Sequence, residues 1–188
     1  MKMFKLKFLF ILYLVIQQSN CASVFSANDI INLMNNYLDT HSIKSYYMTI
    51  DPNELLSEID HKLLSIYQNI LFDKYNIITL NIVANGLFDY GNGLESFLKN
   101  FYKEFNKTFN IQDLRIIVSV ITVKDRRIII DSSNKLKYIF NDDLLYSFKK
   151  DMKSTLEQNH LFLTIYELLK NIENAQKKFI QKNKMSDL

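Results

Sequence analysis

The chain has very little cysteine, proline or glycine, with one cysteine, one proline and three glycines among 188 residues. A lone cysteine cannot form a disulfide within the chain, which leaves the hydrophobic core to stabilise the fold. The sequence also has no internal repeat and no Pro- or Gly-rich linker. We therefore expect a single domain. The roughly 165 residues that remain without the N-terminal leader described below are enough for a self-sufficient core.

Long apolar runs are scarce, and the clearest one lies at the N-terminus. Residues Phe8 to Ile16 follow three lysines and precede a small, polar stretch that ends at Ala22. A membrane-spanning helix needs about 20 apolar residues, so the pattern favours a secretory signal peptide over an anchored helix. We expect the signal peptide to cover residues 1–22, with cleavage after Cys21 or Ala22.

The positive net charge belongs to this leader. Residues 1–22 hold three of the 23 basic residues and none of the 20 acidic ones, so the remaining chain is neutral. A neutral surface argues against a nucleic-acid partner, because binding to phosphates depends on a net basic face. We expect a secreted protein with no membrane anchor after signal removal.

Two apolar segments, Ile116 to Thr122 and Ile128 to Ile130, flank the charged turn Lys124 to Arg127. This pattern predicts two strands joined by a tight, exposed turn. Because the strands are apolar on both sides, helices must cover both faces of the sheet. The fold class predicted is therefore α/β, a three-layer sandwich.

The rest of the chain supplies the helices and one more strand. A strand at 77–83, a helix at 94–105 and the strand at 116–122 form a βαβ unit, whose strands should be parallel. With the antiparallel hairpin, this makes a small mixed sheet flanked by helices. The other helices are expected at 28–38, 51–74, 141–156 and 161–172. The domain is expected to span residues 27–178, with a polar tail at 179–188.

The helix at 51–74 is predicted from a capping pattern at its start and from apolar residues that recur every three or four positions. Asp51 as N-cap, Pro52 at the first position and Glu54 at the third form a capping pattern. Its inward face is then expected to comprise Leu55, Ile59, Leu63, Ile66 and Ile70.

All three glycines, Gly86, Gly91 and Gly93, lie in one loop after the first strand. Loops at the carboxyl ends of parallel strands are where α/β proteins bind ligands. Asp89 in this loop and Asp125 after the neighbouring strand are therefore a candidate calcium site, since calcium takes oxygen ligands. The alternative is that the glycines permit a turn and the aspartates are only solvated.

Other polar residues support no catalytic motif. The histidines, His41, His61 and His160, have no spacing typical of a triad or a zinc site. The pair Asp142 and Asp143 is explained by helix capping. Asn106 begins the sequon Asn-Lys-Thr and is a candidate glycosylation site.

The order of these segments resembles the TPM domain over about residues 51–172. The turn at Asp125 and Arg126, and Asp142 at a helix start, match recognisable features of that family. Many members carry Gly-x-Gly after the hairpin, where this chain has Ser132, Ser133 and Asn134.

That departure fits the nematode branch of TPM proteins, the levamisole-receptor modulator (MOLO) family. The resemblance implies a secretory-pathway, non-enzymatic auxiliary that promotes gating of acetylcholine-gated channels. The alternative comes from plant TPM proteins described as acid phosphatases, which implies a secretory-pathway hydrolase of phosphomonoesters.

Overall fold

The computed structural model describes residues 24–41, 48–87, 93–109 and 114–186. The expected signal peptide and both of its cleavage positions lie outside these ranges. In chain order the elements are β1 (Val24–Phe25), α2 (Ala27–His41), β2 (Met48–Ile50), α3 (Glu58–Tyr75), β3 (Ile78–Ala84), β4 (Gly86–Leu87), α4 (Leu94–Phe109), β5 (Ile116–Thr122), β6 (Arg127–Ser132), α5 (Asp142–Glu157) and α6 (Leu161–Ser186).

The main sheet has four strands in the order β2-β3-β5-β6. β2, β3 and β5 are parallel, and β6 pairs antiparallel with β5. The expected βαβ unit and hairpin are thus confirmed. β1 and β4 form a separate parallel pair. The sequence did not predict β2, which has only three residues.

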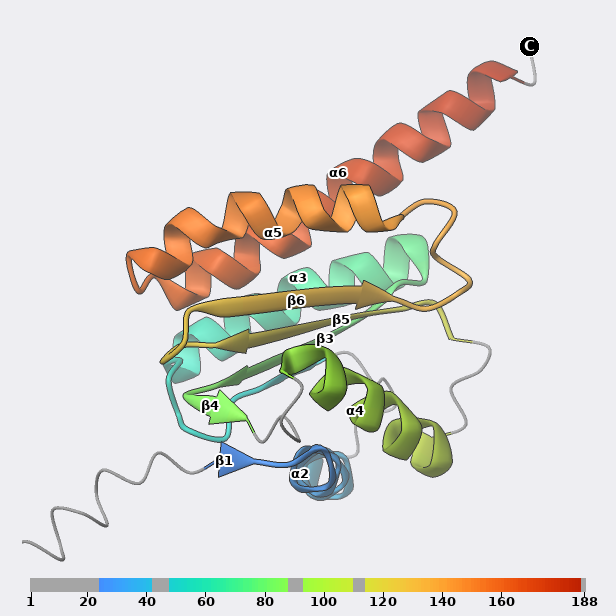
Figure 1. Cartoon of the computed structure of the whole chain (residues 1–188). Helices are drawn as coiled ribbons and strands as arrows, with labels where there is room; N and C mark the ends of the chain where they lie inside the picture. The colour runs from blue at the N-terminus through green and yellow to red at the C-terminus, as the bar shows by residue number, and fades with distance from the viewer. Residues whose placement is uncertain (1–23, 42–47, 88–92, 110–113, 187–188) are drawn as a thin grey trace, which may run out of the picture.

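Helices cover both faces of the sheet, giving the expected three-layer α/β sandwich (Figure 1). α2 and α4 pack on one face, where the rings of Phe97, Phe101 and Phe105 are fully buried. α3, α5 and α6 pack on the other face. Strands β3 and β5 are buried along their whole length because each faces both layers.

The helices expected at 94–105 and 141–156 are confirmed as α4 and α5, but the predicted face of α3 is wrong. Ile59, Leu63 and Ile66 are 69%, 40% and 57% exposed, whereas Leu64 and Leu71 are buried. The helix has apolar residues on two sides, and the inward side also carries the buried Gln68. The side richer in isoleucine therefore faces solvent.

The start of α3 also differs from the prediction, because Asp51 does not cap it. The helix begins at Glu58 with Ser57 as N-cap, and the Ser57 hydroxyl accepts a hydrogen bond from the Asp60 backbone N–H at 3.1 Å. In return, the Asp60 carboxylate accepts a hydrogen bond from the Ser57 N–H at 3.0 Å, which completes a capping box. Residues 51–57 are thus the loop between β2 and α3, and Asp51 serves another role.

The end of the chain is more regular than expected. α6 continues through Ser186, so residues expected as a polar tail extend a helix. The sequence leaves the cap of α5 open between Asn141 and Asp142, and the structure places it at Asn141, which accepts a hydrogen bond from the Leu144 N–H at 2.9 Å. Within the part of the chain that the structure describes, no helix is both long and apolar enough to cross a membrane.

Candidate functional site

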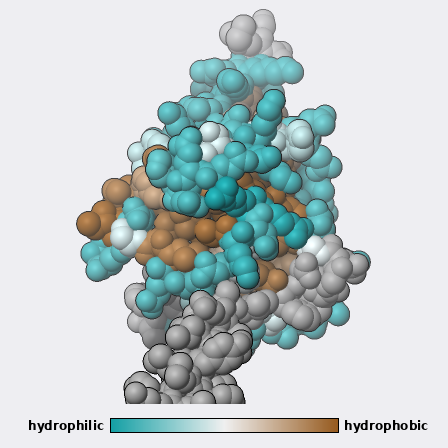
Figure 2. Space-filling view, turned by 60° about the vertical axis from the view of Figure 1, so that its left-hand side comes forward, coloured by the Kyte–Doolittle hydropathy of each residue, from teal (hydrophilic) through white to brown (hydrophobic). Residues whose placement is uncertain are grey.

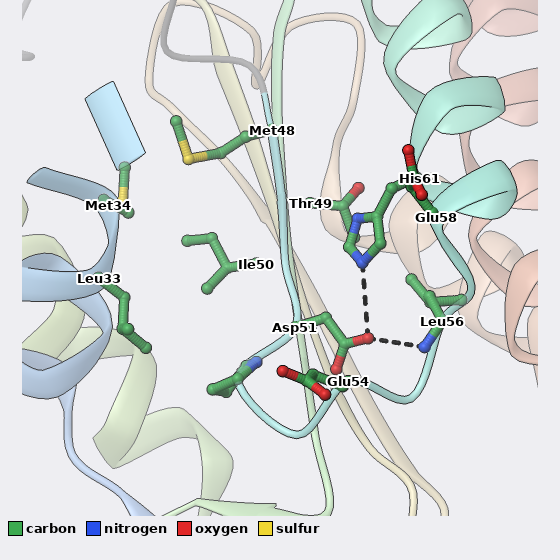
Figure 3. A pocket seen from close by; sticks show the side chains of 11 residues that line it. Leu33, Met34, Met48, Thr49, Ile50, Asp51, Glu54, Leu56, Glu58 and His61 are labelled. Atoms are coloured by element: carbon green, nitrogen blue, oxygen red, sulfur yellow. Dashed lines mark hydrogen bonds and ion pairs between the residues drawn. The ribbon is translucent and has the colours of Figure 1, made fainter. Parts of the chain in front are cut away.

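A groove lies along the outer edge of β2, between α2 and α3 (Figure 3). Its volume is about 530 Å³, within the range of about 300–1,000 Å³ typical of ligand pockets. Its lining comprises Leu33, Met34, Met48, Thr49, Ile50, Asp51, Pro52, Glu54, Leu56, Glu58 and His61. The groove is therefore built by two helices, one edge strand and the loop that follows it.

The two walls of the groove differ in chemistry because side chains of a strand alternate. Met48 and Ile50 point toward α2, where Leu33 and Met34 lie (Figure 3). Thr49 points the other way, toward His61 of α3. One wall is thus apolar and the other polar.

Asp51 follows β2 directly and is the most constrained polar group of the groove. Its side chain has no exposed surface, and its Oδ2 accepts a hydrogen bond from the Leu56 N–H at 2.7 Å. The same oxygen lies 3.6 Å from Nε2 of His61, whose side chain is 37% exposed. Oδ1 is buried and has no hydrogen-bond partner among the described residues.

The pKa of Asp51 is lowered from its ordinary value. Burial of the carboxyl raises its pKa, but the contact with His61 and the backbone N–H groups of Leu55 and Leu56 together lower it by more. Asp51 is therefore a carboxylate at neutral pH. It holds the loop after β2 against the start of α3.

The loops after the parallel strands are tied to one another. The Asn85 N–H, after β3, donates to Oδ1 of Asn53 at 2.9 Å. The N–H groups of Val123 and Lys124, after β5, donate to the carbonyls of Ala84 and Asn85 at 2.9 and 3.2 Å. This end of the molecule is thus a connected surface. Figure 2 shows the side of the molecule that lies on the left in Figure 1, where an apolar area is exposed between hydrophilic residues.

A row of polar side chains runs from the groove into the core. Thr49, Asn81 and Ser119 are register partners on β2, β3 and β5. Ser119 donates to Asn81 at 2.7 Å, and the Asn81 amide donates to the Thr49 hydroxyl at 3.3 Å. Gln68 of α3 completes the row by donating to the Thr79 carbonyl at 2.9 Å. These bonds explain why polar residues are tolerated inside the sheet.

The predicted calcium site stays a prediction. Asp89 and Gly91 lie outside the described residues, and Asp125 is exposed in the turn between β5 and β6. Within the described ranges, no group of three or more His, Cys, Asp or Glu side chains is placed to hold a metal ion. Gly93 has φ +82°, and the guanidinium of Arg127 occupies the space beside it that a Cβ would need.

The remaining predicted residues fall elsewhere. Asn106 is half-buried near the end of α4, with its Oδ1 buried and without a partner in the described chain. Its glycosylation stays a prediction. His160 is exposed before α6, and Asp142 and Asp143 lie in the first turn of α5 as expected. The side chain of His41 is outside the described part.

A second, smaller hollow of about 220 Å³ lies beside β6. Arg126, Arg127, Lys149 and Lys153 line it, together with Glu95 of α4. This hollow is predominantly basic. It therefore differs in character from the groove beside β2.

Sequence reasoning missed the contact between Asp51 and His61. The residues belong to a strand end and to a helix that starts later than predicted, so nothing in their spacing marked them as partners. One signal was available in the sequence. The alternating segment Met48, Thr49, Ile50 is typical of a strand, and Asp51 follows it directly, at the strand end where functional residues often lie.

Comparison with known proteins places the fold. No family model and no curated protein matches the chain. Among solved structures, the N-terminal domain of a P. gingivalis protein is 15% identical, with a TM-score of 0.60 over 82% of this chain and 91% of that one. The N-terminal domain of cg2496 from Corynebacterium glutamicum is 11% identical, with a TM-score of 0.52 over 72% and 84%.

A third solved structure, BA42 from the psychrophilic bacterium Bizionia argentinensis, is 12% identical, with a TM-score of 0.51 over 68% of this chain and 86% of that one. These are TPM-like folds, so the TPM-like fold expected from the sequence is confirmed. At such identities the likeness concerns the fold alone.

Proposed function

We propose that this protein is a secreted, non-enzymatic auxiliary of ligand-gated acetylcholine receptors of the levamisole type, and that it promotes channel gating. The proposal joins the sequence resemblance to the nematode MOLO branch with the expected signal peptide and the neutral charge of the remaining chain. Its partner is a membrane receptor met outside the cell.

The observation that supports a binding role is the groove along β2. Its apolar wall, with Leu33 exposed at the rim and Met48 and Ile50 beneath it, suits the burial of apolar side chains from another protein. Its ionisable pair is already engaged, because Asp51 holds the Leu56 N–H and contacts His61. These contacts hold the polar wall of the groove in one conformation, which suits binding of a partner protein.

Co-expression with candidate receptors in oocytes tests the proposal. We expect larger agonist currents or a lower half-maximal agonist concentration than with receptor alone. A precursor lacking residues 1–22 should have no effect, because it would not reach the cell surface. Unchanged currents and sensitivity across the plausible receptors would refute the function.

The basic hollow beside β6 favours the hydrolase as a second candidate. Arg126, Arg127 and two lysines could stabilise the charge of a phosphoryl group. Asp125, in the adjoining turn, directly precedes Arg126 and Arg127 in the sequence. Release of phosphate from an aryl phosphate by the purified protein, lost on Asp125→Asn, would favour this candidate over the receptor auxiliary.

A further inference from the structure

The two edges of the main sheet are bordered by different chemistry. Hollows beside β6 contain charged side chains, among them Arg127 and Asp131 of the strand itself and Lys103 and Lys137 next to it. Charged side chains along an edge strand discourage the addition of another strand. The edge of β2 is instead bordered by the mostly apolar groove.

The main chain of β2 offers hydrogen-bonding groups to this groove. In a strand, the N–H and C=O groups of alternate residues point to opposite edges. β3 pairs with one edge of Met48, Thr49 and Ile50. On the other side, no strand and no backbone hydrogen bond from the described residues engages these three.

We propose that the groove accepts an extended segment of a partner protein as an added strand beside β2. The proposal rests on the proposed function and specifies how the partner is bound. Alternate side chains of such a strand would enter the two walls. The α2 wall takes apolar residues, and the α3 wall takes basic ones.

The preference for basic residues follows from the charges on the α3 side. Glu54 is exposed at the end of the groove, and the side chain of Glu58 is 83% exposed on its wall. The buried carboxylate of Asp51 lies behind them. Lys62 pairs with Glu58 from the next turn of α3 at 2.6 Å and neutralises part of this charge. The wall stays acidic because Glu54 and Asp51 add to it.

The apolar preference follows from the other wall. Met34, Met48 and Ile50 are buried, while Leu33 is 38% exposed at the rim. An apolar side chain entering here would cover Leu33 and exclude water from it. Three strand residues span about 10 Å, so the bound segment is short and its affinity is modest.

A direct test uses short synthetic peptides and protein purified after expression of the full-length chain. The probe alternates leucine and lysine. One comparison peptide replaces lysine with glutamate, and two others carry backbone N-methyl groups on alternate residues. We expect the leucine–lysine peptide to bind by calorimetry and to slow amide hydrogen exchange in Met48–Ile50.

The peptide series separates an added strand from other modes of binding. The glutamate peptide should bind about tenfold more weakly. One of the N-methylated peptides should also lose binding, because it cannot donate to β2. Equal affinity for all four peptides would overturn the proposal, as would absence of binding by the leucine–lysine peptide.

Matched variants locate the binding at the groove. Leu33→Ser and Glu58→Lys should each weaken binding several-fold. Leu63→Ser is the control for the first, because Leu63 is 40% exposed on the outer side of α3. Glu157→Lys is the control for the second, because Glu157 also pairs with a lysine one turn away, at 3.7 Å. Equal losses in variants and controls would refute a site beside β2.

The same variants distinguish this inference from the proposed function. If receptor currents rise with wild-type protein and with Leu33→Ser alike, the auxiliary role stands and the strand-binding groove fails. If peptides bind but no receptor responds, the groove stands and the receptor role fails. Self-association in sedimentation that Glu58→Lys abolishes would identify a second copy as the occupant and would also overturn the proposal.

Discussion

At the scale of single residues, Asp51 holds the end of β2 in place through its side-chain contacts. Its carboxylate is buried, accepts the Leu56 N–H and lies beside His61. Removing the charge without changing the shape leaves these donors with a weaker acceptor. Asp51 therefore links the edge strand, the loop after it and the first turn of α3.

We predict that Asp51→Asn lowers the free energy of unfolding at pH 7 by about 1–2 kcal/mol. The pKa of Asp51 is lowered in the folded state, so its contribution is present above the unfolded pKa of about 3.9 and is lost as pH falls through the folded pKa. The difference between wild type and variant should thus shrink below about pH 4. Urea denaturation at several pH values measures it.

Asp73→Asn is the control, since Asp73 is exposed on α3 and its replacement should change stability by no more than about 0.5 kcal/mol. A constant difference between wild type and Asp51→Asn from neutral to acid pH would contradict the role of the charge.

The polar row gives a second prediction at this scale. Asn81→Ala would remove the acceptor of the buried Ser119 hydroxyl and the donor to the Thr49 hydroxyl, which keeps only its bond to Oε1 of Gln68 at 3.4 Å. We expect a loss of about 2–3 kcal/mol in the free energy of unfolding. By contrast, Thr122 has a buried hydroxyl with no partner among the described residues, so Thr122→Val should be neutral or stabilising. Thermal and chemical denaturation of both variants would decide, and equal losses would contradict the account.

At the scale of elements, the sequence predicted those whose single apolar stripe faces the core. α4 and α5 are of this kind, because no other side of these helices competes for burial. The hairpin was predicted for a different reason, since β5 is apolar on both sides and is buried along its whole length. α3 has two apolar sides, and the buried one contains Gln68. That glutamine is buried because it donates to the Thr79 carbonyl, a tertiary partner that no local pattern reveals.

The groove escaped prediction for a related reason. β2 is only three residues long, and Asp51-Pro52 after it has the appearance of a helix start. The true capping box, Ser57 and Asp60, lies further along and frees Asp51 for the groove. A site whose residues come together only through contacts distant in sequence therefore cannot be predicted from local patterns and needs the structure.

The reversed face of α3 makes a direct prediction. Ile66→Lys should change the free energy of unfolding by no more than about 0.5 kcal/mol, because Ile66 is 57% exposed. Leu64→Ala should lower it by about 2–5 kcal/mol, because Leu64 is fully buried. Comparable losses in the two variants would restore the face expected from the isoleucine stripe.

At the scale of the whole molecule, the parallel strands bring three loops to one end. The loops after β2 and β3 are joined through Asn53 and Asn85, and those after β3 and β5 through Ala84 and Val123. Asp125 lies in the last of these loops. A cation that bridged them would bind the folded state and not the unfolded chain.

The calcium site predicted from the sequence is testable at this scale. If Asp89 and Asp125 share an ion, calcium at about a hundredfold excess over Kd should add about 2.7 kcal/mol to the free energy of unfolding. For a chain of this size, that raises Tm by about 5–10 °C relative to protein in chelator. Asp89→Asn and Asp125→Asn should each abolish the rise, whereas Asp73→Asn should preserve it. If the melting curves measured with calcium and with chelator coincide, the calcium site is wrong, because an ion that binds only the native state must stabilise it. The glycines would then only permit a turn, and Asp125 would only be solvated.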